Sequence, residues 1–179
     1  MPGTLPPTSA VATPPWWPVG TAKFIALNLA TFGLYHFFWL YENWKGMRRA
    51  GAGSFSPFWR TFFAPVTVYR LFDRVRQDAQ LNVVRAPWSA LGLAAAYFVA
   101  NIAMFIGVPA WLAGAVLLLP VLPVQLTMAR VNGVVAPDAP RNVRFSAADI
   151  VIITLGLALT VFAYQSEQLV NQYLEEWKP

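Results

Sequence analysis

The chain has 179 residues, of which 57% are hydrophobic and only 12% are charged, and its net charge is +5. Soluble domains average about 45–50% apolar and about 25% charged residues, so this composition predicts an all-α membrane protein. The absence of cysteine excludes disulfides, thiolate nucleophiles, iron–sulfur clusters and cysteine zinc sites. No basic module with its own core is visible, so we expect no nucleic-acid partner.

The first twenty residues form a proline-rich tail. Residues 1–20 contain six prolines and no charged side chain, a composition that sustains neither a helix nor a packed core. We therefore predict a disordered or extended segment. It is not a secretory signal, because no positively charged region precedes the first apolar run. Trp16 and Trp17, near its end, are expected at the head-group level of a membrane.

Three apolar stretches predict four membrane-spanning helices. A helix of roughly 20 apolar residues crosses the ~30 Å hydrocarbon core, and the middle stretch has twice that length. It must turn back at Gly107-Val108-Pro109, because glycine and proline end one helix and begin another. The predicted spans cover residues 22–41, 89–107, 109–130 and 147–165.

The last span begins with a capping arrangement. Ser146 is followed three residues later by Asp149, a pairing that satisfies free backbone amides at a helix start. Residues 166–179 keep apolar positions at helical spacing. We expect them to continue the helix beyond the bilayer as an amphipathic tail, so that residues 21–165 form the membrane domain.

Residues 55–76 predict one amphipathic helix that lies in the membrane interface. An arginine near the centre of a span costs about 2.5–3.5 kcal/mol, and Arg60 and Arg70 both fall in this segment. An interfacial helix keeps both guanidinium groups in water while its aromatic side chains enter the acyl region. Its apolar positions recur at spacings of three and four, at Phe55, Phe58, Trp59, Phe62, Phe63, Val66, Tyr69 and Phe72.

Basic residues gather on one side of this four-span arrangement. The positive-inside rule makes that side cytoplasmic, which places both termini outside the cytoplasm. Lys23 and Lys178 are left on the other side. The clustered residues are Lys45, Arg48, Arg49, Arg60, Arg70, Arg74, Arg76, Arg85, Arg130, Arg141 and Arg144.

Two motifs suggest a family. The run FGLYHFFWLYENW at 32–44, followed by SPFWRTFFAP at 56–65, resembles a group of bacterial inner-membrane proteins of unknown function. Those proteins carry a phenylalanine-glycine-aliphatic-tyrosine run that leads to W-x-Y-x-x-W, and then S-P-F-W-R. The resemblance covers residues 31–72 and implies a bacterial cytoplasmic membrane. It brings no activity, cofactor or catalytic residue.

The basic and aromatic residues are candidates for docking. Each exposed cation near an anionic membrane contributes about 1 kcal/mol, and Asp73 and Asp78 offset part of the charge through helix-spaced pairs with Arg70 and Arg74. Such a cluster can simply determine topology, or it can be a platform for lipid or a partner protein. The candidate docking residues are Lys45, Arg48, Arg49, Trp59, Arg60, Arg70 and Arg74.

Four polar residues stand within predicted spans. His36 is the only histidine; one histidine cannot build a metal site, so we expect a buried, hydrogen-bonded side chain, with a proton carrier as the alternative. Asn28 and Asn101 fall at similar depth and could hydrogen-bond across the bundle or line a polar substrate site. Gln125 has the same two interpretations.

No nucleophile–base pair, metal cage or glycine-rich phosphate loop is recognisable. The sequence therefore predicts no enzyme, no cofactor and no metal. The favoured interpretation is a multi-pass membrane accessory or scaffold protein that binds anionic lipid and a partner complex. The alternative is a small channel or transporter, formed by a homo-oligomer and lined by Pro120, Pro123, Asn28, Asn101 and His36.

Overall fold

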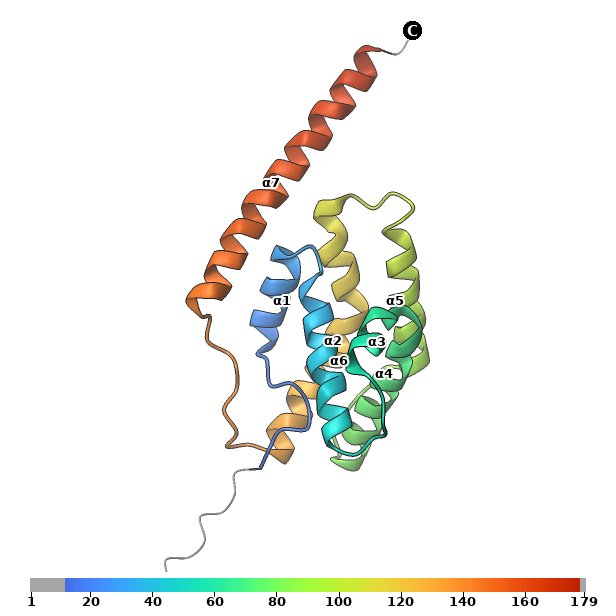
Figure 1. Cartoon of the computed structure of the whole chain (residues 1–179), viewed down its shortest axis with the longest axis vertical. Helices are drawn as coiled ribbons and strands as arrows, with labels where there is room; N and C mark the ends of the chain where they lie inside the picture. The colour runs from blue at the N-terminus through green and yellow to red at the C-terminus, as the bar shows by residue number, and fades with distance from the viewer. Residues whose placement is uncertain (1–11, 178–179) are drawn as a thin grey trace, which may run out of the picture.

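The computed structural model describes residues 12–177, so the prediction for the first part of the tail lies outside the described residues. Over this range the chain is all-helical, with no named strand. Figure 1 shows a bundle from which the last helix extends well past one end. The helices are α1 (Thr21–Ala30), α2 (Tyr35–Arg49), α3 (Pro57–Phe62), α4 (Ala64–Leu81), α5 (Ala90–Ala103), the 3₁₀-helix η1 (Ala110–Leu112), α6 (Ala113–Val135) and α7 (Ala147–Glu176).

The first predicted span, residues 22–41, is wrong as a single helix. Phe32 and Gly33 take left-handed backbone angles, with φ values of 53° and 87°, and the chain reverses there, so that α1 and α2 run in opposite directions (Figure 1). The rings of Phe24 and Trp39 are 5.3 Å apart, whereas a continuous helix would separate them by about 22 Å. Hydropathy cannot detect this turn, because the turn depends on a glycine and not on composition.

The predicted interfacial helix, residues 55–76, is two helices that share an end. α3 stops at Phe63, whose ψ of 33° interrupts the helix, and α4 then continues to Leu81. The apolar positions also divide, because the aromatic residues of α3 face outward while α4 packs on the bundle through a second set. The core face of α4 consists of Ala64, Val68, Leu71, Phe72, Val75 and Ala79.

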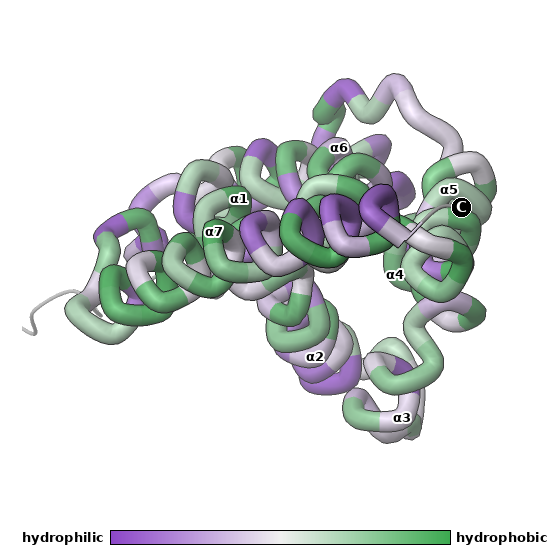
Figure 2. Tube along the Cα trace, turned by 90° about the horizontal axis from the view of Figure 1, so that it is seen from above, coloured by the Kyte–Doolittle hydropathy of each residue, from purple (hydrophilic) through white to green (hydrophobic). Residues whose placement is uncertain are grey.

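Within residues 12–177, two helices, α6 and α7, are long and apolar enough to cross a membrane, in place of the four predicted. α5 ends at Ala103 and is a shorter apolar helix. The predicted cap at the last helix is confirmed, because Ser146 and Asp149 form a reciprocal capping box. α7 also runs unbroken through residues 166–176, where Figure 2 shows hydrophilic residues becoming frequent toward its C-terminal end.

The bundle has two chemically different ends. One end, here named the basic end, holds residues 12–20, 43–56, 82–89 and 130–141, which come from four separate parts of the chain (Figure 1). The opposite end, the tip end, holds the α1–α2 turn and the connection between α5 and α6. α6 lies between them at the centre of the core, with Val121, Val124 and Met128 fully buried.

Candidate membrane-docking site

The described part of the tail, residues 12–20, is anchored to the basic end and is not disordered there. The backbone N–H of Trp16 donates to Oδ1 of Asn132 at 3.1 Å, and Nδ2 of Asn132 donates back to the Trp16 carbonyl at 3.0 Å. The backbone N–H of Trp17 donates to Oδ1 of Asn43 at 3.0 Å. The side chain of Trp16 is buried in the bundle rather than exposed, so Trp16 packs within the protein and its predicted depth in a membrane stays a prediction.

Asn43 and Asn132 are residues that the sequence analysis missed. Asn43 exposes 1% of its surface and Asn132 exposes 6%. Their side-chain amides form hydrogen bonds with backbone groups of the tail, which has no regular secondary structure to satisfy them. The sequence held only a weak signal: each amide interrupts a helical face that is otherwise apolar. Polar residues in such positions need a partner when they are buried.

The predicted docking residues fall into two groups. Lys45, Arg48 and Arg49 stand at the C-terminal end of α2, where the two arginines are exposed. Trp59 and Arg60 belong to α3, and Arg70 and Arg74 belong to α4. The candidate residues therefore form two surfaces. One lies at the C-terminal end of α2, and the other lies along α3 and α4.

Arg60 is partly exposed, and its guanidinium also lies over two aromatic rings. Its guanidinium carbon lies 3.7 Å from the ring centroid of Phe55 and 4.8 Å from that of Trp44, the geometry of a cation–π contact. Burial, and then the neighbouring Arg70, lower the pKa of Arg60 from its ordinary value. Arg60 thus ties α3 to the end of α2, while its charge stays at the edge of the aromatic surface.

An aromatic face covers the outside of α3. Phe58, Trp59, Phe62 and Phe63 expose 58%, 57%, 63% and 52% of their surfaces. Their rings touch in series, with Trp59 stacked on Phe63 at 6.0 Å and Phe58 on Phe62 at 6.4 Å. A contiguous patch of large exposed apolar side chains is uncommon on a monomeric soluble protein and marks an interaction surface.

Two basic residues of the candidate set are paired with acids. Nζ of Lys45 lies 2.9 Å from Oε1 of Glu42, and Nε of Arg74 lies 3.0 Å from Oδ1 of Asp78, as predicted for the second pair. Among residues 12–177 the predicted Arg70–Asp73 ion pair is absent, since Asp73 accepts from Gln77 instead. Arg48, Arg49, Arg60 and Arg70 are the members of the candidate set that take part in no ion pair among residues 12–177.

The predicted intramembrane polar residues serve the fold in different ways. His36 is fully buried, as predicted, and bonds the Gly33 carbonyl through Nδ1 and the Tyr97 hydroxyl through Nε2, the latter at 2.7 Å. Because a carbonyl only accepts, Nδ1 carries the proton and the Tyr97 hydroxyl donates to Nε2. Gln125 accepts from Nε1 of Trp39 at 2.7 Å and donates to the Val19 carbonyl at 2.9 Å.

The sequence analysis suggested that Asn28 and Asn101 could form hydrogen bonds across the bundle. Within residues 12–177 neither side chain does so. Nδ2 of Asn28 donates to the Phe24 carbonyl, and Nδ2 of Asn101 donates to the Tyr97 carbonyl, each four residues back along its own helix. Such back-bonding is a common alternative for short polar side chains inside helices.

Lys23 is also committed to an internal contact. Its Nζ lies 2.6 Å from Oδ2 of Asp149 and 2.9 Å from Oδ1 of Asn142. This pair joins the first turn of α1 to the first turn of α7. The sequence analysis placed Lys23 on the side opposite the basic cluster and did not anticipate this pair, because the partner is more than a hundred residues away.

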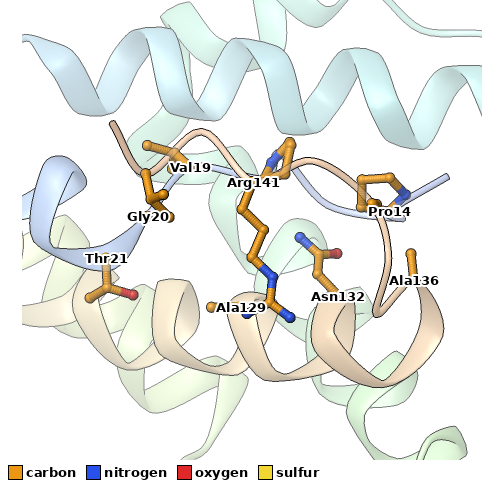
Figure 3. Close-up of a pocket in the computed structure, with 11 residues that line it drawn as sticks. Pro14, Val19, Gly20, Thr21, Ala129, Asn132, Ala136 and Arg141 are labelled. Atoms are coloured by element: carbon orange, nitrogen blue, oxygen red, sulfur yellow. The ribbon is translucent and has the colours of Figure 1, made fainter. Parts of the chain in front are cut away.

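A cavity of about 200 Å³ lies beside the tail at the basic end. Figure 3 shows Arg141 extending across it toward α6, between Gly20 and Thr21 on one side and Pro14 and Ala136 on the other. Most of the remaining lining side chains are apolar. The full lining is Pro14, Pro18, Val19, Gly20, Thr21, Ala129, Asn132, Ala136, Ala139, Arg141 and Val143.

Within the range 12–177, no group of three His, Asp or Glu side chains is arranged to hold a metal ion. Comparison with known proteins found no matching family model, no matching curated protein and no matching solved structure.

Proposed function

We propose that this chain is a non-enzymatic membrane accessory protein whose basic end rests on an anionic leaflet. At 1.5 Å per residue, α6 and α7 are about 35 and 45 Å long, enough for a ~30 Å hydrocarbon core. The apolar side chains of α7 support this placement, because Ile150, Val151, Leu155 and Phe162 each expose more than half of their surface. In a membrane these apolar side chains would contact lipid, whereas in water they would form an unusually large exposed apolar patch.

The hairpin α5–α6 enters the same bilayer from the basic end. α5 alone is about 21 Å long, so the hairpin reaches the far interface through the segment after Ala103. Phe105 and Ile106 there expose 90% and 79% of their surfaces, as expected for side chains inserted in lipid.

Orientation follows from the positive-inside rule, which makes the basic end cytoplasmic. The fold-back between α1 and α2 changes the earlier topology, because residues 12–20 bond to Asn43 and Asn132 at that same end. We therefore place the described tail in the cytoplasm and the C-terminal end of α7 on the opposite side. The setting remains the bacterial cytoplasmic membrane that the sequence resemblance implies.

Two observations carry the proposal together: the aromatic face of α3 and the unpaired arginines at the end of α2. Phe58, Trp59, Phe62 and Phe63 supply an apolar surface that can enter the acyl boundary, and Arg48 and Arg49 supply charge for anionic head groups. The same surface could seat a membrane partner protein, which is the scaffold part of the proposal. Neither activity requires a catalytic group.

The channel alternative has less support. His36 and Gln125 are fully buried and bonded within one chain, so they do not face an axis that copies could share. Asn28 is also buried, with 1% of its surface exposed. A pore lined by these residues would require the bundle to open.

Topology can be tested by cysteine labelling, because the chain has no cysteine. We expect Thr13→Cys and Ser54→Cys to react with a membrane-impermeant maleimide only from the cytoplasmic side. Gln172→Cys should react only from the opposite side. Labelling of Ser54→Cys and Gln172→Cys from one common side would contradict the proposed crossing of α7.

Lipid and partner binding can be tested by purification in mild detergent. We expect the wild-type protein to retain phosphatidylglycerol in excess over its share of the membrane, and Arg48→Gln with Arg49→Gln to reduce that excess. A bare monomer, free of anionic lipid and of any partner, would contradict the proposal.

A further inference from the structure

The cavity beside the tail differs from the open aromatic face, because apolar side chains line most of it and one exposed cation, Arg141, extends across it. Its volume of about 200 Å³ far exceeds the roughly 10–15 Å³ that a single water requires. The walls come from three separate segments, the tail, the C-terminal half of α6 and the loop 136–145. A pocket of this kind, with few polar groups, takes a ligand that is part apolar and part charged.

Arg141 is the charged group of this pocket, and the next residue, Asn142, fixes the backbone there through two hydrogen bonds to the tail. The N–H of Asn142 donates to the Pro18 carbonyl at 2.9 Å, and the N–H of Gly20 donates to the Asn142 carbonyl at 3.0 Å. The side chain then crosses the cavity and reaches α6 over Gly133, where a Cβ would lie 3.4 Å from Nη2 of Arg141. These hydrogen bonds fix the position of the backbone from which the Arg141 side chain extends into the cavity.

Two polar side chains near the cavity already have partners. Lys23 is paired with Asp149, and both polar atoms of the Asn132 side chain bond to Trp16. Among residues 12–177, Arg141 itself takes part in no ion pair. The pocket therefore offers one guanidinium with free donors and no carboxylate competing for it.

We propose that the cavity beside Arg141 binds the phosphodiester head group of one anionic phospholipid molecule. A guanidinium matches a phosphate through two parallel N–H···O bonds, and a single cation balances the single negative charge of a phosphodiester. The apolar lining, which includes Val19 and Val143, suits the glycerol and first methylenes of a lipid better than a free phosphate dianion. This inference rests on the proposed membrane function and adds a defined lipid site to it.

The experiment uses the whole protein in nanodiscs that contain phosphatidylglycerol and phosphatidylcholine, followed by native mass spectrometry in detergent. We expect the wild type to retain one phosphatidylglycerol molecule, and Arg141→Ala to weaken that retention by at least about tenfold, the effect of losing one charge-assisted hydrogen bond. Addition of glycerol 3-phosphate or inorganic phosphate should not displace the lipid. Displacement by either soluble anion at low concentration would show that the site takes free phosphate instead.

Arg144→Ala is the matched control, because Arg144 stands in the same loop and is exposed. Among residues 12–177, the hydrogen bond of Arg144 is made by its backbone carbonyl, with Lys23, and Arg144 does not line the cavity, so the substitution removes the same charge and leaves the lining unchanged. We expect retention within about twofold of wild type. A second variant, Ala129→Leu, keeps every charge but fills the cavity, and it should also lose the lipid.

The outcomes separate this inference from the broader function. Equal loss in Arg141→Ala and Arg144→Ala, or full retention in Ala129→Leu, would overturn the pocket while leaving anionic lipid binding in place. Wild-type protein that retains no phosphatidylglycerol at all would overturn both.

Discussion

α6 and α7 meet the same criteria of length and hydropathy but occupy opposite positions in the fold. In the most apolar 18 residues of each helix, 56% are buried inside the bundle for α6 and 11% for α7. α6 is surrounded by α1, α4 and α5, whereas α7 lies mainly along α1. Hydrophobicity therefore identifies both helices without distinguishing a core helix from a peripheral one.

This difference in burial arises from how many sides of each helix pack against other helices. α6 presents Leu117, Val121, Val124 and Met128 to neighbours on several sides. α7 has one buried residue, Gly156, and is otherwise fixed near its ends, by Lys23 at its start and by a bond from Trp111 to Glu167 further along. We infer that α6 stabilises the bundle and that α7 mainly anchors it in lipid.

The sharpest test of this contrast is a pair of truncations. Met128→Ala on α6 removes a fully buried side chain and should lower the free energy of unfolding by about 2–5 kcal/mol. Leu157→Ala on α7, where 59% of the residue is exposed, should change it by no more than about 0.5 kcal/mol. Reversible unfolding of both variants in mixed micelles measures the difference. Similar losses would show that α7 is as much a part of the core as α6.

The contact between α7 and α1 offers a second test. A Cβ at Gly156 would lie 1.8 Å from the Ala30 carbonyl oxygen, so Gly156→Ala must push the two helices apart, at a cost of about 1–3 kcal/mol. We expect faster hydrogen exchange in residues 147–160 while α6 stays protected. Loss of protection throughout the bundle would contradict a peripheral role for α7.

Gly46→Ala is the control for that substitution. The nearest atom to its added Cβ is the Pro15 carbonyl oxygen, at an ordinary contact distance of 3.6 Å. Since alanine is the better helix former, this variant should be neutral or more stable by about 0.5–1 kcal/mol. Destabilisation equal to that of Gly156→Ala would point to a general intolerance of glycine replacement.

Sequence patterns predicted the helical class, the start of α7 at Ser146 and the burial of His36, because each depends on local or compositional signals. They failed where a distant contact decides the structure. Residues 22–41 look like one span until Phe32 and Gly33 take left-handed angles, and the fold-back becomes evident only from the contact between Phe24 and Trp39.

The candidate site shows the same limit. A spacing of three and four correctly marked the aromatic residues of α3 as one set, yet it also drew in Phe72, which belongs to the buried face of α4. The tail looked disordered because proline excludes a helix, and its partners Asn43 and Asn132 lie elsewhere in the sequence. No pattern within residues 12–20 could have identified those amides.

A third difference between the two long helices concerns their glutamines. Gln125→Leu on α6 leaves the indole N–H of Trp39 and the carbonyl of Val19 without their partner, which should cost about 1–3 kcal/mol. Gln168→Leu on α7 is the same change at an exposed position and should leave unfolding unaltered. Because Gln125 also holds the tail, its loss should raise the hydrogen-exchange rate at Gly20 in the folded protein, which a defect confined to the core would not do. An unchanged exchange rate at Gly20 would mean that the hydrogen bonds of Asn43 and Asn132 are sufficient to hold the tail. The hydrogen bond from Gln125 to Val19 would then contribute nothing to its position.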